Sequence, residues 1–318
     1  MSARSQDPSR REFVAAGAAA LISVGAARLP RFELTAQQAI DRIRANAGVP
    51  WREPTVDTFK AGDPRTVVTG IATTVMATLP VLRQAAGAGR NLIVTCEPTF
   101  YNWNDDPGTR ASDPVYLAKK AFIEEHHLVI WRFSDHWGAR VPNEFATALA
   151  DTLGWAKLRT PDNPLVFMYA IPSTTLGELA AHARARLGVR GGLRLVGNPA
   201  MRIRRVLVSP GTTTLQATVE SLPHADVILS GEPREWEAVE YVFDTASAGQ
   251  PKGMIAVGRV VSQEPGMGAC AAWLRTLIPE VPVEPIAVGD PYWRPPPSPS
   301  PELRRAGAFG EATAGRPL

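Results

Sequence analysis

Two stretches of the chain share one pattern of apolar and polar positions, and each ends in a Glu-Pro dipeptide. Each stretch begins with an apolar strand and a threonine-rich turn, continues with a helical segment, and closes with a second apolar strand. The first runs from Thr66 to Pro98 and the second from Arg204 to Pro233. This alternation predicts one βαβ unit in each place.

The repetition also predicts the architecture. We expect an α/β fold with two pseudo-symmetric α/β lobes built from related βαβ units, and a site in the cleft between them. The two Glu-Pro dipeptides contribute Glu97 and Glu232, each at the carboxyl end of a predicted strand. Open α/β sheets bind ligands at that edge, so both carboxylates are candidates for one site.

Periodicity and turn residues place the other elements along the chain. Helices are expected over 35–46, 115–125, 145–153, 174–187, 236–246 and 267–277, and further strands over 128–133, 165–170, 193–196, 254–257 and 283–288. The expected domains are a leader over residues 1–30, a first lobe over 31–160, a second lobe over 161–294, and a disordered proline-rich tail over 295–318. The lobes are free to share segments.

Composition is that of a globular protein with a real core, at 45% hydrophobic and 20% charged residues. The net charge of +3 is small, and the arginines are scattered with few aromatic residues among them. A nucleic-acid partner is therefore not expected. The two cysteines, Cys96 and Cys270, are too few for a disulfide framework, although they leave room for one bridge.

The first residues resemble an export signal. Arg10 and Arg11 precede a run of about 13 mildly apolar residues, which is too short to span a bilayer. A twin arginine in this position predicts export by the twin-arginine route to the periplasm or the exterior, with no stable membrane anchor. The alternative is an alanine-rich leader on a cytoplasmic protein.

Residues that could carry chemistry follow three of the predicted strands. They are Cys96 with Glu97, Asp135 with His136, and Arg259 with Gln263 and Glu264. Thiolate, carboxylate and imidazole are ligands that a divalent transition metal accepts. Cys96 could instead be a small buried residue, which is a common role for a free cysteine.

Four separated segments, in order, resemble the signatures of the NIF-three-like dinuclear metal-centre proteins, also labelled GTP cyclohydrolase I type 2-like. These segments are 91–100, 225–232, 258–264 and 290–292. The resemblance implies two α/β lobes related by pseudo-symmetry, a two-metal site between them, and a homo-oligomer, often a ring-shaped hexamer. Metal-dependent hydrolysis is the activity usually suggested for this family.

The chain departs from the family pattern at its metal ligands. Cys96 stands where the family has histidine, and two imidazoles are missing around His136. Arg259 replaces a ligand histidine and Gln263 replaces the glutamate four residues later, while Glu264 remains one position further on. These exchanges remove two ligands and add a fixed positive charge.

The charges predict that the two-metal site is lost. Unit charges ~4 Å apart interact by ~4 kcal/mol at an effective dielectric near 20, which is ample to empty one metal position. We expect Arg259 to pair with Glu97 where an ion would otherwise lie. The alternative is a single divalent ion, such as zinc, manganese or iron, held by Cys96, Glu97 and His136.

The sequence thus favours a family member with an eroded metal site, either a binding protein for an unknown small molecule or a weakly active remnant. Candidate residues lining the cleft are Arg259, Gln263 and Glu232, although Glu232 could equally cap the helix that follows it. The competing hypothesis is a functional metal hydrolase with a rearranged ligand set. That set is Cys96, Glu97, Asp135, His136 and Glu264, and its metal would supply the nucleophilic water. An oligomeric scaffold is a third hypothesis, supported by family analogy alone.

Overall fold

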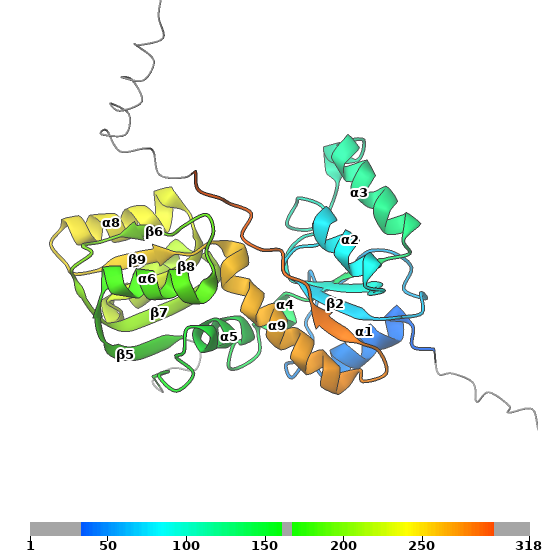
Figure 1. Ribbon diagram of the computed structural model, residues 1–318, viewed down its shortest axis with the longest axis horizontal. Coiled ribbons are helices and arrows are strands. Elements are labelled where there is room, and N and C mark those ends of the chain that lie inside the picture. The colour runs from blue at the N-terminus through cyan, green and yellow to red at the C-terminus, as the bar shows by residue number, and fades with distance from the viewer. Residues whose placement is uncertain (1–32, 161–166, 296–318) are drawn as a thin grey trace, which may run out of the picture. The chain divides into compact units, whose positions relative to one another are not determined.

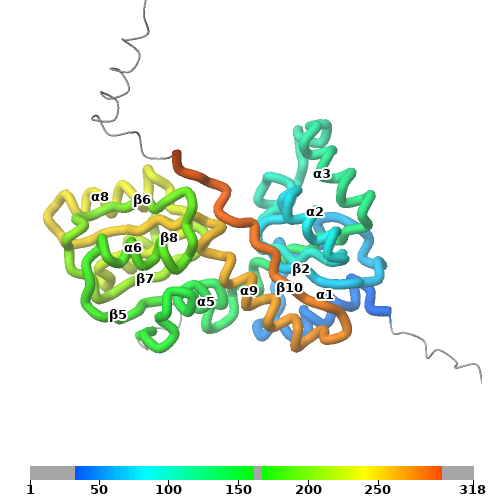
Figure 2. Tube along the Cα trace, viewed as in Figure 1, coloured from blue at the N-terminus to red at the C-terminus, as the bar shows by residue number. Residues whose placement is uncertain are grey.

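The first sheet, to which the strand labelled β2 in Figure 1 belongs, has five strands in the order β1-β4-β3-β2-β10. The computed structural model describes residues 33–160 and 167–295. The strands of this sheet are β1 (Phe59–Ala61), β2 (Ile71–Thr74), β3 (Leu92–Thr95), β4 (Val129–Arg132) and β10 (Val283–Pro285). All neighbours are parallel except the edge strand β1, which runs antiparallel to β4. The strand β10 comes from the far end of the described chain and lies beside β2 (Figure 2).

Helices pack on both faces of this sheet, because its buried strands alternate their apolar side chains between the faces. Leu92 and Val94 of β3 join a core with α1 (Ala36–Ala45) and α9 (Arg259–Leu277). Ile93 faces the other way and joins a core with α2 (Leu79–Gly87) and α3 (Pro114–Glu125).

The second sheet also has five strands, in the order β5-β7-β8-β9-β6. They are β5 (Met168–Thr175), β6 (Arg194–Val196), β7 (Arg202–Thr213), β8 (Val227–Pro233) and β9 (Gly253–Ala256). The strands β7, β8 and β9 are parallel, and both edge strands are antiparallel to them. Like β2-α2-β3-α3-β4 in the first sheet, β7-α7-β8-α8-β9 is a βαβαβ run, so the repeat in the sequence is a repeat in the fold.

The faces of the second sheet are covered in the same way. One face packs on α5 (Glu144–Thr152) and α6 (Leu176–Leu187). The other packs on segments around α7 (Leu215–Ser221) and α8 (Glu240–Ser247). The α/β class expected from the sequence is therefore confirmed, with two five-stranded sheets among the described residues.

Helix α9 takes part in the cores of both sheets. Val261, in its first turn, packs in the core on the second sheet. Met267 and Leu274, further along, pack in the core on the first. The described residues from Leu34 onward accordingly belong to one compact unit.

Three local predictions were wrong. The threonine-rich turn expected after the opening strand is strand in both repeats, since β2 covers Ile71–Thr74 and β7 continues to Thr213. Helix α9 begins at Arg259 and not near Met267, because Pro265 lies inside the helix without ending it. Glu232 lies within β8 and caps no helix, since the π-helix after it (Glu235–Val239) has no side-chain cap.

Several sequence predictions lie outside the described residues. They concern the twin-arginine leader, the proline-rich tail beyond residue 295, and the first two residues of the strand expected over 165–170. Within 33–160 and 167–295, none of the helices has the length and apolar character needed to cross a membrane.

A β-bulge in β7 sets the pairing beside Glu232. Ser209 pairs with Ser230 and Thr212 pairs with Glu232, so β7 has one more residue than β8 in this interval. Gly211 supplies the extra residue with φ of 68°, a left-handed conformation that favours glycine. Gly231 lies against it so closely that a Cβ there would be 2.4 Å from the Gly211 carbonyl oxygen.

Replacing Gly231 with alanine is therefore expected to lower the free energy of unfolding by about 2–3 kcal/mol, because the added methyl meets backbone atoms that cannot rotate away. Gly268→Ala is the matched control. Gly268 lies inside α9 with open space around its Cβ position, so alanine there should stabilise the protein by up to about 1 kcal/mol. Denaturant unfolding of both variants measures the difference, and equal effects would contradict this account of the bulge.

Candidate functional site

One guanidinium group joins the acidic residues of the two repeats. Arg259 Nη1 donates to Glu97 Oε1 at 2.8 Å, and Arg259 Nε donates to Glu232 Oε2 at 2.5 Å. Its third nitrogen, Nη2, donates to the Thr212 hydroxyl. We call these four residues the Arg259 cluster. The pair between Arg259 and Glu97 that the sequence predicted is present.

The backbone fixes each member of the cluster. Glu97 comes two residues after β3, and its amide donates to the Val75 carbonyl oxygen at 2.9 Å. Thr212 and Glu232 are neighbours across β7 and β8 because of the bulge. Arg259 is the first residue of α9 and follows Gly258, whose φ is 99°.

The charges of the Arg259 cluster keep the arginine protonated. Burial on its own would lower the pKa of Arg259, but the attraction of Glu97 and Glu232 outweighs it and holds this pKa above its ordinary value. The amino end of a helix attracts anions, so the two carboxylates also suit the start of α9. One cation thus faces two carboxylates, with the Glu97 side chain largely buried and that of Glu232 about half exposed.

Cys96 does not reach the Arg259 cluster. Its side chain is buried in the core on the first sheet, and the sulfur lies 3.7 Å from the Val75 carbonyl oxygen. Burial raises the pKa of this thiol well above its ordinary value, and the charge of Glu97 raises it further. A buried, protonated thiol is a packing residue and a poor metal ligand.

Asp135 and His136 belong to a different part of the structure, the short helix α4 (Asp135–Gly138). His136 Nδ1 lies 2.7 Å from Asp57 Oδ2, and His136 Nε2 accepts a hydrogen bond from the Arg52 amide at 2.9 Å. The ring also stacks on Trp51 with centroids 3.6 Å apart. Both ring nitrogens are therefore occupied by the protein itself, in the tautomer that carries its proton on Nδ1.

Asp57 organises this second site, which the sequence did not identify. Its carboxylate accepts hydrogen bonds from the amides of Ser134, Asp135 and His136 at 2.6, 3.0 and 2.9 Å, in addition to the imidazole contact. Asp135 in turn accepts from the Thr55 hydroxyl at 2.8 Å. Asp57 belongs to no motif and lies about 80 residues before its partners in the chain. Its role becomes visible only in the fold, where its side chain is buried.

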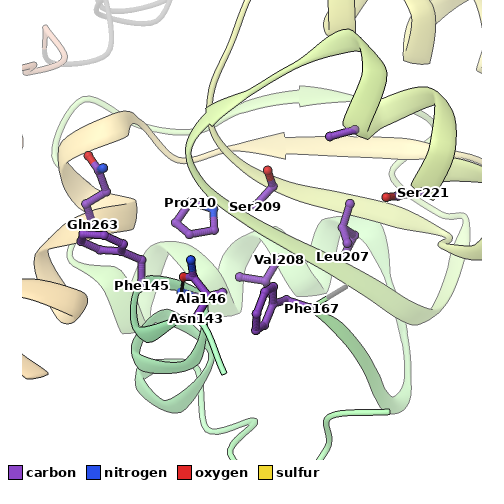
Figure 3. A pocket seen from close by; sticks show the side chains of 11 residues that line it. Asn143, Phe145, Ala146, Phe167, Leu207, Val208, Ser209, Pro210, Ser221 and Gln263 are labelled. Carbon is purple, nitrogen blue, oxygen red and sulfur yellow. Dashed lines mark hydrogen bonds between the residues drawn. The ribbon is translucent and has the colours of Figure 1, made fainter. Parts of the chain in front are cut away.

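Among the described residues, no side-chain hydrogen bond or ion pair joins Gln263 or Glu264 to the Arg259 cluster. Gln263 is 8% exposed, and its Oε1 has no hydrogen-bond partner among the described residues. It lies at one end of a pocket of about 220 Å³ that Phe145 and Pro210 also line (Figure 3). Glu264 Oε1 accepts a hydrogen bond from the Gly289 amide at 2.7 Å.

The donor groups expected for a metal ion do not converge in this arrangement. Within residues 33–160 and 167–295, no group of three or more histidine, cysteine, aspartate or glutamate side chains is placed to hold an ion. The thiol of Cys96 faces the core, the nitrogens of His136 are taken, and the carboxylates of the Arg259 cluster surround a guanidinium. As placed, these residues do not fit a divalent metal.

Two pockets meet at Arg259, and both include Met76. One, of about 200 Å³, is lined by residues that include Glu232, Arg194 and Tyr292. The other, of about 360 Å³, is lined by Met76, Ala77, Thr78, Glu97, Pro98, Thr99, Tyr101, Asn102, Trp103, Lys119 and Arg259. We call the larger one the Glu97 pocket. Its volume suits a small organic molecule.

Comparisons with known proteins agree on one family and one fold. A family model described as Duf34/NIF3 (NGG1p interacting factor 3) matches residues 58–248. The structure of a hypothetical protein from Staphylococcus aureus is similar with a TM-score of 0.65 at 15% identity, over 83% of this chain and 100% of that one. A Bacillus cereus protein related to NIF3 is similar with a TM-score of 0.63 at 13% identity, over 84% and 98%.

Reduced HcgD from Methanocaldococcus jannaschii has a TM-score of 0.56 at 14% identity, over 80% of this chain and 98% of that one. At these identities the likeness concerns the fold alone. No curated protein matches the chain.

The role of Asp57 can be tested by Asp57→Ala, which we expect to lower the free energy of unfolding by about 3 kcal/mol, because three amides and an imidazole lose a buried partner. Asp106→Ala is the control, since Asp106 is exposed and accepts one backbone hydrogen bond, from the Gly108 amide. It should cost less than about 1 kcal/mol. Denaturant unfolding measures both, and a small effect of Asp57→Ala would show that α4 is held by other contacts.

Proposed function

Because the chain belongs to the Duf34/NIF3 family, whose model matches more than half of the chain's residues, we propose that it is a small-molecule-binding member in which a guanidinium replaces the metal centre. The single observation that carries the proposal is the Arg259 cluster. Its arginine contacts the carboxylates of both repeats, at the position where the family resemblance implies metal ligands.

Electrostatics support the replacement. A pair of divalent ions requires several anionic or imidazole ligands to offset the repulsion between the ions. Here Glu97 and Glu232 already neutralise a fixed cation that no change of pH in the ordinary range can remove. A dication entering beside Arg259 would meet repulsion from the guanidinium and would gain no new anionic ligand in exchange.

The contacts of the other candidate ligands support binding in preference to hydrolysis. A metal hydrolase requires an open ligand position where the ion activates water. Cys96 and His136 would have to break their present contacts before they could contribute to such a site. The two pockets at Arg259 need no rearrangement to accept a ligand.

Metal content is the direct test. The untagged protein, dialysed against zinc, manganese or iron(II), should retain far less than one ion per chain when measured by plasma mass spectrometry. The double variant Arg259→His with Gln263→Glu should retain more, because it removes the cation and restores two ligand groups. One or two tightly held ions per chain in the unaltered protein would overturn the proposal and favour the hydrolase.

Stability provides a second test. Arg259→Met should lower the free energy of unfolding by about 2 kcal/mol, because it leaves two carboxylates facing each other, one of them largely buried. Arg194→Met is the matched control, since Arg194 pairs with Glu235 at 2.7 Å while both side chains stay mostly exposed. It should change the free energy by less than about 0.5 kcal/mol. Equal losses in the two variants would mean that the Arg259 cluster is only a surface ion pair.

A further inference from the structure

We propose that Lys119 is a reactive amine in the Glu97 pocket and that it captures ring-bearing aldehydes or ketones as imines. The proposal does not depend on the metal question. If the unaltered protein bound metal, the function proposed above would fail and this inference would stand.

Lys119 lines the Glu97 pocket although its side chain is almost wholly buried, at 3% exposure. Its Nζ donates to the Thr99 carbonyl oxygen at 2.5 Å. It also lies 5.8 Å from the centre of the Phe100 ring and 5.1 Å from that of Tyr101. Within the described chain, no salt bridge joins this ammonium to a carboxylate. It differs in this from Lys120, the next residue, which is about half exposed and pairs with Glu124.

A buried ammonium without a counter-ion favours its neutral form. Removal from water lowers the pKa of Lys119 to about 8, and the charge of Asp105 opposes that change only in part. At this pKa of about 8, roughly a tenth of the amine is unprotonated at pH 7, far more than for an ordinary lysine. Desolvated lysines of this kind are the ones that form Schiff bases with carbonyl compounds.

The other described charged groups near Lys119 are paired with other residues, so none of them forms an ion pair with its amine. Asp105 Oδ2 lies 3.4 Å from Lys60 Nζ and 3.7 Å from Arg132 Nη1, so its charge is already shared by two cations. Glu97, which also lines the pocket, is paired with Arg259 at 2.8 Å. Tyr101 is uncharged near neutral pH, since a phenol ordinarily has a pKa of about 10 and partial desolvation raises this one further.

The loop over residues 99–106 presents aromatic rings at the rim of the pocket. Tyr101 and Trp103 are 55% and 71% exposed, which is unusual for rings of this size. Tyr101 and Asp105 both have φ of 63°, a costly conformation for residues other than glycine. Such strain persists only where the surroundings impose it, and it is frequent at ligand-binding loops.

Buried polar contacts impose that conformation. Asp105 Oδ1 accepts hydrogen bonds from the amides of Thr99 and Phe100 at 2.5 and 2.9 Å. Arg132 Nη1 donates to the Trp103 carbonyl oxygen at 2.5 Å. The loop is thus fixed from below while its rings stay open to solvent, as expected for a surface on which a planar ring stacks.

Thr99 supplies a second, independent sign of a ligand. Its side chain is 1% exposed and lines the Glu97 pocket, yet its hydroxyl has no hydrogen-bond partner among the described residues. Buried hydroxyls are rarely left unpaired. A carbonyl oxygen held beside Lys119 would be a suitable partner for this hydroxyl.

The reaction is a condensation that needs no oxidant or reductant. The lone pair on Lys119 Nζ attacks the carbonyl carbon, and the electron pair of the C=O bond moves to oxygen to give a carbinolamine. The C–O bond then breaks while the nitrogen lone pair forms the C=N bond. The carbonyl oxygen leaves as water with both protons of the neutral amine.

Reductive trapping tests the proposal. The full chain is incubated with benzaldehyde and cyanoborohydride, which reduces any imine to a stable benzylamine, and peptide mass spectrometry locates the label. Near neutral pH we expect Lys119 to be labelled at least about tenfold more than Lys120, because an ordinary surface lysine has a pKa of about 10.4 and is almost wholly protonated. Labelling at Lys119 should rise with pH through about 8, since the neutral amine is the reacting form.

Two variants complete the experiment. Lys119→Arg keeps the positive charge and should remove the selective label, whereas Lys120→Arg should leave it unchanged. Labelling of unaltered protein at Lys119 no greater than at Lys120 would overturn the proposal, whether or not either variant folds. Trp103→Ala should reduce trapping of benzaldehyde more than trapping of formaldehyde, which has no ring to stack. An equal reduction for both aldehydes would reject the stacking surface.

Discussion

The structure depends on one guanidinium held between two carboxylates. Glu97 and Glu232 come from corresponding places in two repeats, and without a cation between them their charges would repel at the start of α9. Arg259 supplies that cation from the helix itself, so the neutralising group is covalently part of the fold and is present in every molecule. The bulge at Gly211, where Gly231 approaches closely, places Thr212 opposite Glu232, and the Thr212 hydroxyl accepts from the third nitrogen of the guanidinium.

The remaining candidate ligands pack in a core or form hydrogen bonds with other groups of the protein. The Cys96 thiol fills space in a core, His136 connects Asp57 to the Arg52 backbone, and Glu264 fixes the amide of Gly289. Each of these side chains thereby fills a core position or pairs with a polar group of the protein itself. The two pockets at Arg259 are lined by aromatic rings, an amine, hydroxyls and carboxylates.

The contact of Arg259 with Glu97 was predicted from the resemblance to a family that has metal ligands at those positions. Local patterns in the sequence were sufficient for the repeats and the α/β class, because strand and helix periods leave direct traces in the chain. They were insufficient for Asp57 and Lys119. Asp57 acts on residues about 80 positions away, and Lys119 looks like any lysine on a helix until the fold buries it against Thr99. The start of α9 was misplaced for a different reason. Pro265 resembles a helix terminator, yet it is the seventh residue of α9, and the helix continues through it although proline has no amide to donate.

The position of helix α9 allows ligand binding to be detected by thermal unfolding. It begins at the guanidinium and continues into both hydrophobic cores, through Val261 on one side and Met267 on the other. Any molecule that binds the native helix terminus but not the unfolded chain must raise the melting temperature of the entire unit, by mass action. A thermal screen of metabolite libraries can therefore detect occupants of either pocket, whatever their chemical class.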